Sequence, residues 1–206
     1  MKVEQLFLLG VLVQKTSGAT DLIPASDAGS HQIVKHSAPD ELFSLSKHTF
    51  YLGKLIANLQ SLEFVIRIFL SKLPDSQPMG IPYGADIYSY PVGTKFLQSA
   101  VTDYSPLGKL VDRFNTGAMA AGLTQRIAPT IVDIRDALAH GRLSAPASGG
   151  EMRIIKFGRP DAEGKVEMTY NELMDHKWFK RHVKQVYEAL IIVVEADAHL
   201  EQRKKI

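Results

Sequence analysis

Apolar residues recur every three or four positions in three long stretches of the chain, and this spacing predicts amphipathic helices. We expect the first helix over residues 40–73, the second over about 124–140 and the third over about 170–203. Their apolar faces comprise Leu52, Leu55, Leu59, Leu62, Ile66 and Phe69 in the first, Ile127, Ile131, Ile134 and Leu138 in the second, and Phe179, Val183, Val186, Leu190, Val194 and Ala198 in the third. These faces are expected to meet in one hydrophobic core.

Local signals indicate where two of the helices begin. Ser105 followed by Pro106 predicts a short additional helix over about 105–115, because proline fits the first position of a helix. Thr169 and Glu172 have the spacing of a capping box, which predicts the start of the last helix.

Between the helices the apolar period is lost. Residues 74–104 are interrupted by prolines and glycines and predict a long irregular loop, of a length that is usually functional or mobile. Residues 141–150 predict a flexible connection, and β-forming residues on both sides of RPDAEG predict a β-hairpin at about 151–169. The predicted fold class is therefore mainly all-α, an up-and-down four-helix-type bundle with a small inserted β-hairpin.

Residues 1–39 are expected to form an N-terminal helix and linker ahead of a helical domain of residues 40–206. The apolar run at 3–14 predicts the helix, although a lysine before it and small residues after it also suit a signal peptide. Glu4, in the region that should be positive, favours the helix. No stretch approaches the roughly 18 apolar residues of a membrane span, so no membrane partner is expected.

The composition of the chain excludes several kinds of catalytic and metal-binding site. The 206 residues include 24 Lys and Arg against 22 Asp and Glu, and a net charge of +2 is too small for wholesale binding of nucleic acid. The absence of cysteine excludes disulfides, thiol catalysis and Cys-ligated metals, and it fits a cytoplasmic protein. Because the chain also lacks a glycine-rich phosphate loop, an HExxH motif and a nucleophile elbow, we expect no cofactor and no metal site.

The segment IVDIRDALAHGRL, residues 131–143, carries the most specific candidate chemistry. Arg135 and His140 interrupt the helical pattern about 7.5 Å apart along the axis and about 140° apart around it, so they bracket one flank. Gly141 follows in the C′ position of the helix. Two interpretations stay open: a site for a phosphate ligand, or an arginine paired with Asp136 or a nearby glutamate beside a histidine that caps the helix end.

Two further sets of charges are visible in the sequence. On the first helix, Glu63 and Arg67 are one turn apart and are expected to pair. On the last helix, four cations share one side: Lys177, Lys180, Arg181 and Lys184. These four are either a solvated face or a surface for a nucleic-acid backbone.

The segment IRDALAHG resembles the Arg–polar–xxx–His signature of the HEPN superfamily (higher eukaryotes and prokaryotes nucleotide-binding domain). Arg135 matches the arginine, Asp136 the polar residue and His140 the histidine, and the order of predicted helices over about 40–204 also agrees. In toxins silenced by nucleotidylation, a tyrosine stands where this chain has Arg142, so that silencing is not expected here. Arg142 instead joins the four cations of the last helix as a candidate RNA-binding residue.

The resemblance implies a metal-independent endoribonuclease that works as a homodimer, in a toxin–antitoxin or phage-defence system with an antitoxin protein as a further partner. Arg135, Asp136 and His140 would be its catalytic residues. A histidine can serve as base or acid, and an arginine can hold the charge that develops on the phosphate. Other family members bind nucleotides or proteins without cutting, so a non-catalytic binding module is the alternative hypothesis.

Overall fold

The computed structural model describes residues 39–203 except 75, 79, 82–84 and 145–151, with side chains from Lys47 onward. The chain divides into two compact units, Met1–Thr49 and Phe50–Ile206, and the candidate site lies in the second. The helix predicted over 3–14 lies outside the described residues. The described part is mostly helical with one small antiparallel sheet, and none of its helices is both long and apolar enough to span a membrane.

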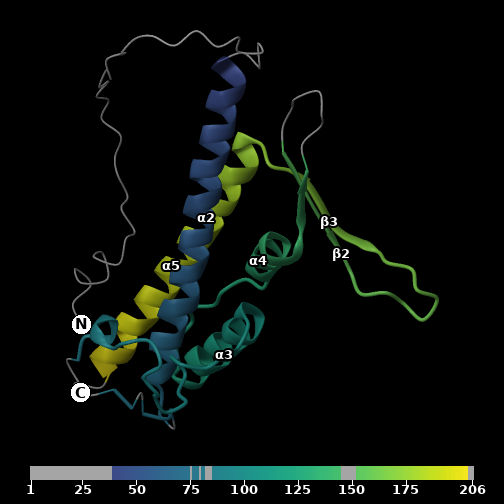
Figure 1. The fold of residues 1–206 in the computed structure, drawn as a ribbon. Helices are drawn as coiled ribbons and strands as arrows, with labels where there is room; N and C mark the ends of the chain where they lie inside the picture. Colours follow the sequence, from purple (N-terminus) through teal and green to yellow (C-terminus); the bar gives the residue numbers. More distant parts are fainter. Residues whose placement is uncertain (1–38, 75, 79, 82–84, 145–151, 204–206) are drawn as a thin grey trace, which may run out of the picture. The chain divides into compact units, whose positions relative to one another are not determined.

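Two long helices, α2 (Pro39–Ser71) and α5 (His176–Arg203), run side by side from Phe50 onward (Figure 1). They run in the same direction, because Tyr51 stacks on Phe179 near their beginnings and Lys72 Nζ binds Asp197 Oδ2 at 2.8 Å near their ends. The first and fourth helices of an up-and-down bundle run in opposite directions, so the predicted order does not hold for this pair. The described end of the loop returns to this first long helix, where Arg67 binds Asp103 and the carbonyl of Ser105, before the next helix begins at Leu107.

Two shorter helices, α3 (Leu107–Ala120) and α4 (Thr130–His140), follow the loop. Helix α3 begins two residues later than predicted, after Pro106 rather than at Ser105. Helix α4 begins six residues later than predicted, because the side chain of Asn115 holds the backbone of Ile127 outside the helix. Asn115 Oδ1 accepts from the Ile127 N–H at 2.9 Å and its Nδ2 donates to the Ile127 carbonyl at 3.0 Å.

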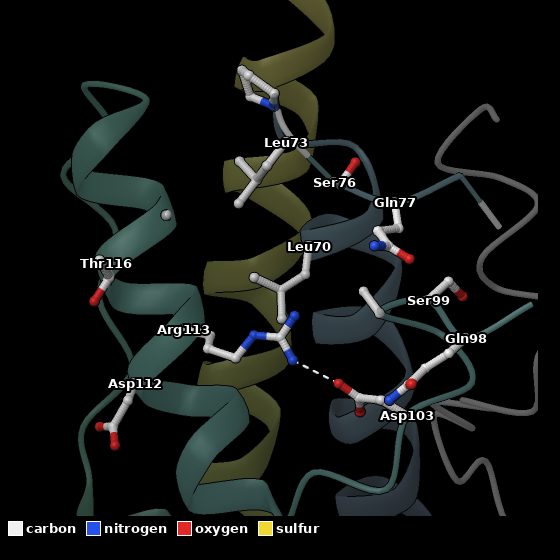
Figure 2. A pocket seen from close by; sticks show the side chains of 13 residues that line it. Leu70, Leu73, Ser76, Gln77, Gln98, Ser99, Asp103, Asp112, Arg113 and Thr116 are labelled. Atoms are coloured by element: carbon white, nitrogen blue, oxygen red, sulfur yellow. Dashed lines mark hydrogen bonds and ion pairs between the residues drawn. The ribbon is translucent and has the colours of Figure 1, made fainter.

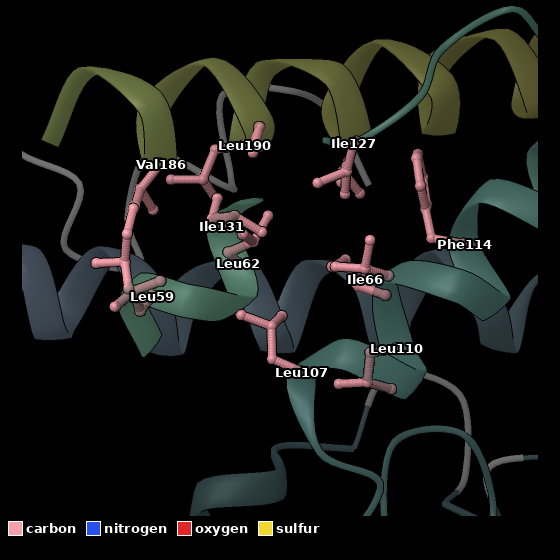
Figure 3. Packing of buried hydrophobic residues seen from close by; sticks show 14 of the residues in the cluster. Leu59, Leu62, Ile66, Leu107, Leu110, Phe114, Ile127, Ile131, Val186 and Leu190 are labelled. Atoms are coloured by element: carbon pink, nitrogen blue, oxygen red, sulfur yellow. The ribbon is translucent and has the colours of Figure 1, made fainter. Parts of the chain in front are cut away.

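The hydrophobic core lies between the four helices, as the periodic apolar faces predicted. Figure 3 shows Ile127, from the segment before α4, together with side chains from all four: Leu59, Leu62, Ile66, Leu107, Leu110, Phe114, Ile131, Val186 and Leu190. Of the sixteen residues predicted on the apolar faces, eleven are buried, and the other five are half-buried: Leu52, Leu138, Val183, Val194 and Ala198. The first three of these five pack against the core. Burial of the helix faces is the main contribution to the stability of this unit.

The insertion between α4 and α5 is a three-stranded antiparallel sheet rather than a simple hairpin. Strand β2 (Arg153–Phe157) pairs with β3 (Met168–Leu173) as predicted, but β1 (Arg142–Ser144) pairs with the other edge of β2. The described end of the predicted 141–150 connection is therefore a strand. In Figure 1 the β2–β3 loop extends away from the helices.

The predicted capping box is wrong. Thr169 and Glu172 lie in β3, where Glu172 pairs with Ile154 of β2 and Thr169 falls at an irregularity in the pairing, and α5 begins only at His176. Asp175 caps α5 instead, because its Oδ1 accepts a hydrogen bond from the Trp178 N–H at 2.6 Å.

Candidate functional site

Helix α4 presents the motif residues on its surface. Its buried positions are Ile131, Ile134 and Ala137, so the side chains of Arg135, Asp136 and His140 lie off the core-facing stripe. Arg135 and Asp136 are half-buried and His140 is exposed. The arrangement agrees with the prediction that neither motif cation is part of the core.

Arg135 is held by a carboxylate from another helix. Its Nε donates to Oε1 of Glu63 on α2 at 3.2 Å, with 29% and 25% of the two side chains exposed. The predicted pair of Glu63 with Arg67 is therefore wrong, because each residue binds a partner from a different element. Glu63 therefore occupies the Nε side of the Arg135 guanidinium.

Asp136 lies between two cations. Its Oδ1 is 3.6 Å from Arg135 Nη1 and its Oδ2 is 3.7 Å from Nζ of Lys156 on β2. Sequence analysis missed Lys156, because only the pairing of the inserted strands brings it to α4. The available signal was its position two residues after Ile154 in the strand, since residues two apart share a face of a strand and Ile154 is buried.

His140 is the last residue of α4, and its side chain makes no hydrogen bond or ion pair with the described residues. Gly141 follows with an extended backbone, φ −76° and ψ 171°, rather than the left-handed conformation expected of a C′ glycine. Close packing requires the glycine instead. A Cβ there would collide with the carbonyl oxygen of Ala137 and lie 3.0 Å from that of Ile155.

Arg142 lies two residues beyond His140, at the start of β1. It is exposed, and its guanidinium carbon lies 5.4 Å from the centre of the Phe157 ring on β2. The end of α4 therefore leads directly into the sheet, with one motif side chain and one candidate RNA-binding side chain on either side of Gly141.

The four cations predicted on one side of α5 are all exposed: Lys177, Lys180, Arg181 and Lys184. Two of them have acidic partners. Arg181 forms an ion pair with Glu172 on β3, and Lys184 Nζ lies 3.5 Å from Glu188 Oε1. These two carboxylates weaken the positive electrostatic field of the four cations.

A buried histidine lies where β3 meets α5. The ring of His182 packs edge-on against Trp178 at 4.5 Å, its Nδ1 is 3.3 Å from Gln185 Oε1, and its Nε2 is 3.7 Å from Glu172 Oε2. Burial lowers the pKa of His182, and the nearby Arg181 lowers it further against the opposing effects of Gln185 and Glu172. Its burial and its contacts with β3 make it a structural residue of this junction.

The long loop is anchored by Asp103, a residue that sequence analysis did not single out. Arg67 on α2 binds this carboxylate and also donates to the carbonyl of Ser105 at 2.8 Å, while Arg113 Nη1 binds Asp103 Oδ2 at 2.6 Å. Burial raises the pKa of Asp103, but Arg113, the Ser105 N–H and Arg67 together lower it to about 2. The Asp103 carboxylate thus ties the loop to two helices.

A cavity of about 670 Å³ opens beside this anchor, between the end of α2, the loop and α3. Figure 2 shows Arg113 reaching across from α3 to Asp103, with Leu70 and Leu73 above it in the view. Neither this cavity nor a second one near Gln125 and His199 includes Arg135 or His140. Within the described part of the chain, no group of three or more His, Asp or Glu side chains is arranged to hold a metal ion.

Comparisons with known proteins find no matching family model, no similar curated protein and no similar solved structure.

Proposed function

We propose that this chain is a HEPN-like helical domain and a metal-independent endoribonuclease, cytoplasmic and active as a homodimer. Two cations at the surface of α4 carry the proposal: Arg135 is oriented by Glu63, and His140 is exposed at the helix end. An oriented guanidinium beside an accessible imidazole supplies the two functions that metal-free cleavage of RNA requires. The sequence signature that these residues form supports the same assignment.

In the proposed reaction, one histidine removes the proton of the ribose 2′-hydroxyl and the 2′-oxygen attacks the adjacent phosphorus. The bond from phosphorus to the 5′-oxygen breaks, and a second histidine donates a proton to the leaving oxygen. Arg135 stabilises the negative charge that develops on the phosphate oxygens. Because one chain supplies a single His140, a second copy of the chain would supply the other histidine.

Glu63 and Asp136 have supporting roles in this proposal. Glu63 makes the shorter contact with Arg135 and comes from another helix, so it fixes the direction of the guanidinium. Asp136, at 3.6 Å from Arg135 and 3.7 Å from Lys156, keeps both cations near the end of α4. We therefore assign the orientation of Arg135 to both carboxylates, with Glu63 the stronger partner.

The alternative is a non-catalytic module that binds RNA, a nucleotide or a partner protein. The observation that favours it is the engagement of Arg135 by Glu63, together with the neutralised cations Arg181 and Lys184 on α5. An arginine retained by an internal carboxylate binds phosphate less strongly than a free one. In either case, a toxin–antitoxin or phage-defence role with a protein antitoxin as partner is the proposed context.

Cleavage of single-stranded RNA in excess EDTA tests the proposal. Losing the phosphate-stabilising cation or the proton-transfer group typically slows such a reaction roughly a hundredfold or more. We expect this loss for Arg135→Ala and for His140→Ala, with the helical circular dichroism of both variants unchanged. His199→Ala is the matched control and should cut at the wild-type rate.

Equal cleavage by the wild type and the Arg135→Ala/His140→Ala double variant would overturn the assignment of endoribonuclease activity to these two residues. RNA binding by the wild type without cleavage, lost on Arg135→Ala, would support the binding module.

A further inference from the structure

The inserted sheet has two chemically different faces. Ile154 is buried, Lys156 reaches Asp136 on α4, and Glu172 reaches Arg181 on α5, so these residues define the face toward the helices. Alternate residues point to the opposite side of a strand. We call that side the outer face; its residues are Arg142, Ser144, Arg153, Ile155, Phe157, Asn171 and Leu173, with Met168 paired to Phe157.

The strand pairing places the outer-face residues next to one another. Arg142 pairs with Ile155, Ser144 with Arg153, and Ile155 with Asn171. Most of these side chains are exposed, and only Ile155 and Phe157 are half-buried. In Figure 1 the helices of the Phe50–Ile206 unit lie on one side of β2 and β3, and none of these described helices packs on the outer face.

Charge is separated between the two faces. The outer face carries Arg142 and Arg153 and, among the described strand residues, no Asp or Glu. The carboxylate of β3, Glu172, lies on the helix side and is paired with Arg181. The outer face is therefore locally positive although the whole chain has a net charge of only +2.

The outer face also offers a flat surface for a base. The guanidinium of Arg142 lies over the Phe157 ring, and Arg153 Nη1 is held by Asn171 Oδ1 at 2.7 Å. Unpaired bases stack on aromatic rings and on arginine planes, and arginines also bind the phosphates between them. Over four residues of β2, Arg153 and Phe157 are about 13 Å apart along the strand.

We propose that the outer face of the inserted sheet binds single-stranded RNA and guides it to the end of α4. Phe157 and Arg142 stack against a base, and Arg142 and Arg153 bind phosphates. This inference rests on the proposed function, since it names the surface that delivers RNA to His140. Arg142 follows His140 by only two residues, so RNA that leaves the sheet at β1 arrives at the motif helix.

A single strand fits this face better than a duplex. The bases of a duplex are stacked on one another and are not available to an aromatic platform, whereas those of a single strand are. The proposal therefore names an unpaired strand as the occupant, and a duplex is a competing outcome of the test.

The test measures fluorescence anisotropy of a labelled 12-nucleotide single-stranded RNA with the full chain. All variants carry His140→Ala, so that the probe is not consumed. Arg142→Gln with Arg153→Gln removes two cations from the outer face, and Lys95→Gln with Lys109→Gln removes two exposed cations elsewhere as a matched control. An RNA duplex of the same length is the second probe.

We expect the outer-face double variant to bind at least tenfold more weakly than the control. Its plot of log affinity against log salt should be less steep by about 1.4, at about 0.7 for each phosphate of a single strand that the protein no longer neutralises. Phe157→Leu, which keeps an apolar side chain in the half-buried position, should weaken binding about tenfold, while Phe157→Trp should not. Arg142→Lys should keep the salt dependence and lose part of the affinity.

Equal binding by the outer-face and control variants would overturn the inference, as would tighter binding of the duplex than of the single strand. Cleavage by the chain without the His140 substitution is measured separately. Binding through the outer face without any cleavage would leave the inference standing and remove the endoribonuclease. Cleavage at the same rate with and without the outer-face substitutions would support the endoribonuclease and overturn the inference about the outer face.

Discussion

The guanidinium of Arg135 on α4 and the carboxylate of Glu63 on α2 are joined at 3.2 Å, across 72 positions of sequence. Because the carboxylate comes from another helix, the contact fixes the direction in which the guanidinium points. It also links the motif helix to α2, the longest of the described helices.

Glu63→Gln should reduce the rate of RNA cleavage about tenfold while changing stability little. A partly exposed ion pair contributes roughly 1 kcal/mol or less to folding, so a loss of activity would reflect the orientation of Arg135. Initial cleavage rates and urea denaturation measure the two effects. Glu195→Gln, at an exposed position of α5, is the control. Faster cleavage by Glu63→Gln would mean that Glu63 withholds Arg135 from RNA.

Asp103→Asn should destabilise the fold at neutral pH. The pKa of Asp103 is lowered from 3.8 to about 2, and this difference corresponds to roughly 2 kcal/mol. Because the folded-state pKa is depressed, this contribution is present above about pH 4 and is lost as the pH falls toward 2. Urea denaturation of both proteins should give a difference at pH 7 that narrows below pH 4. A difference that does not change with pH would show that the charge of Asp103 is not the cause.

His182 should make the fold sensitive to mild acid. Its folded-state pKa is below the ordinary value of 6.5, so the unfolded chain takes up a proton that the folded chain resists. Above pH 6.5, His182 is neutral in both the folded and the unfolded chain and does not change the free energy of unfolding with pH. Below pH 6.5, the free energy of unfolding falls as the pH decreases. Glu172, Arg181 and Gln185 are the polar groups that face it. Thermal denaturation at pH 7.5 and 5.5 should show a smaller loss for His182→Gln than for the wild type, whereas His199→Gln should behave like the wild type.

Gly141→Ala should destabilise the fold by about 1–3 kcal/mol, because the added methyl group has no room between the end of α4 and β2. The backbone at Gly141 is ordinary, so a left-handed conformation contributes nothing to the cost. Gly53→Ala is the matched control: no atom lies within 4 Å of its added Cβ, and alanine is the better helix former by roughly 1 kcal/mol. If Gly141→Ala were as stable as the wild type, the close packing of α4 on the sheet would be wrong.

The core was predictable because it depends on a local period. Leu55, Leu59 and Leu62 repeat every three or four residues in the sequence and are all buried in the structure. The start of α5 was not predictable in this way, because Thr169 and Glu172 satisfy a local capping pattern as well as a strand. The pairing of β3 with β2 decides between them, and that pairing is a tertiary contact.

The position of Arg135 and His140 off the buried stripe of α4 agrees with the sequence pattern, whereas the partners of Arg135 and Asp136 could not be predicted. Arg135 and His140 stand at a recognisable spacing in the sequence. Glu63, however, is 72 residues from Arg135, and Arg67, an equally suitable cation for Glu63, is only one turn away from Glu63 on the same helix. In the folded chain Arg67 pairs with Asp103, and Glu63 pairs with Arg135. Lys156 likewise reaches Asp136 only because the inserted sheet packs on α4.

Mass spectrometry of the RNA products, after incubation with the wild type and with His140→Ala in excess EDTA, tests the proposed function most directly. Attack by the adjacent hydroxyl leaves a 2′,3′-cyclic phosphate on one product and a 5′-hydroxyl on the other. We predict both ends with the wild type and neither with His140→Ala. Uncut RNA in the wild-type reaction, or products ending in 5′-phosphate, would contradict a metal-independent endoribonuclease at Arg135 and His140.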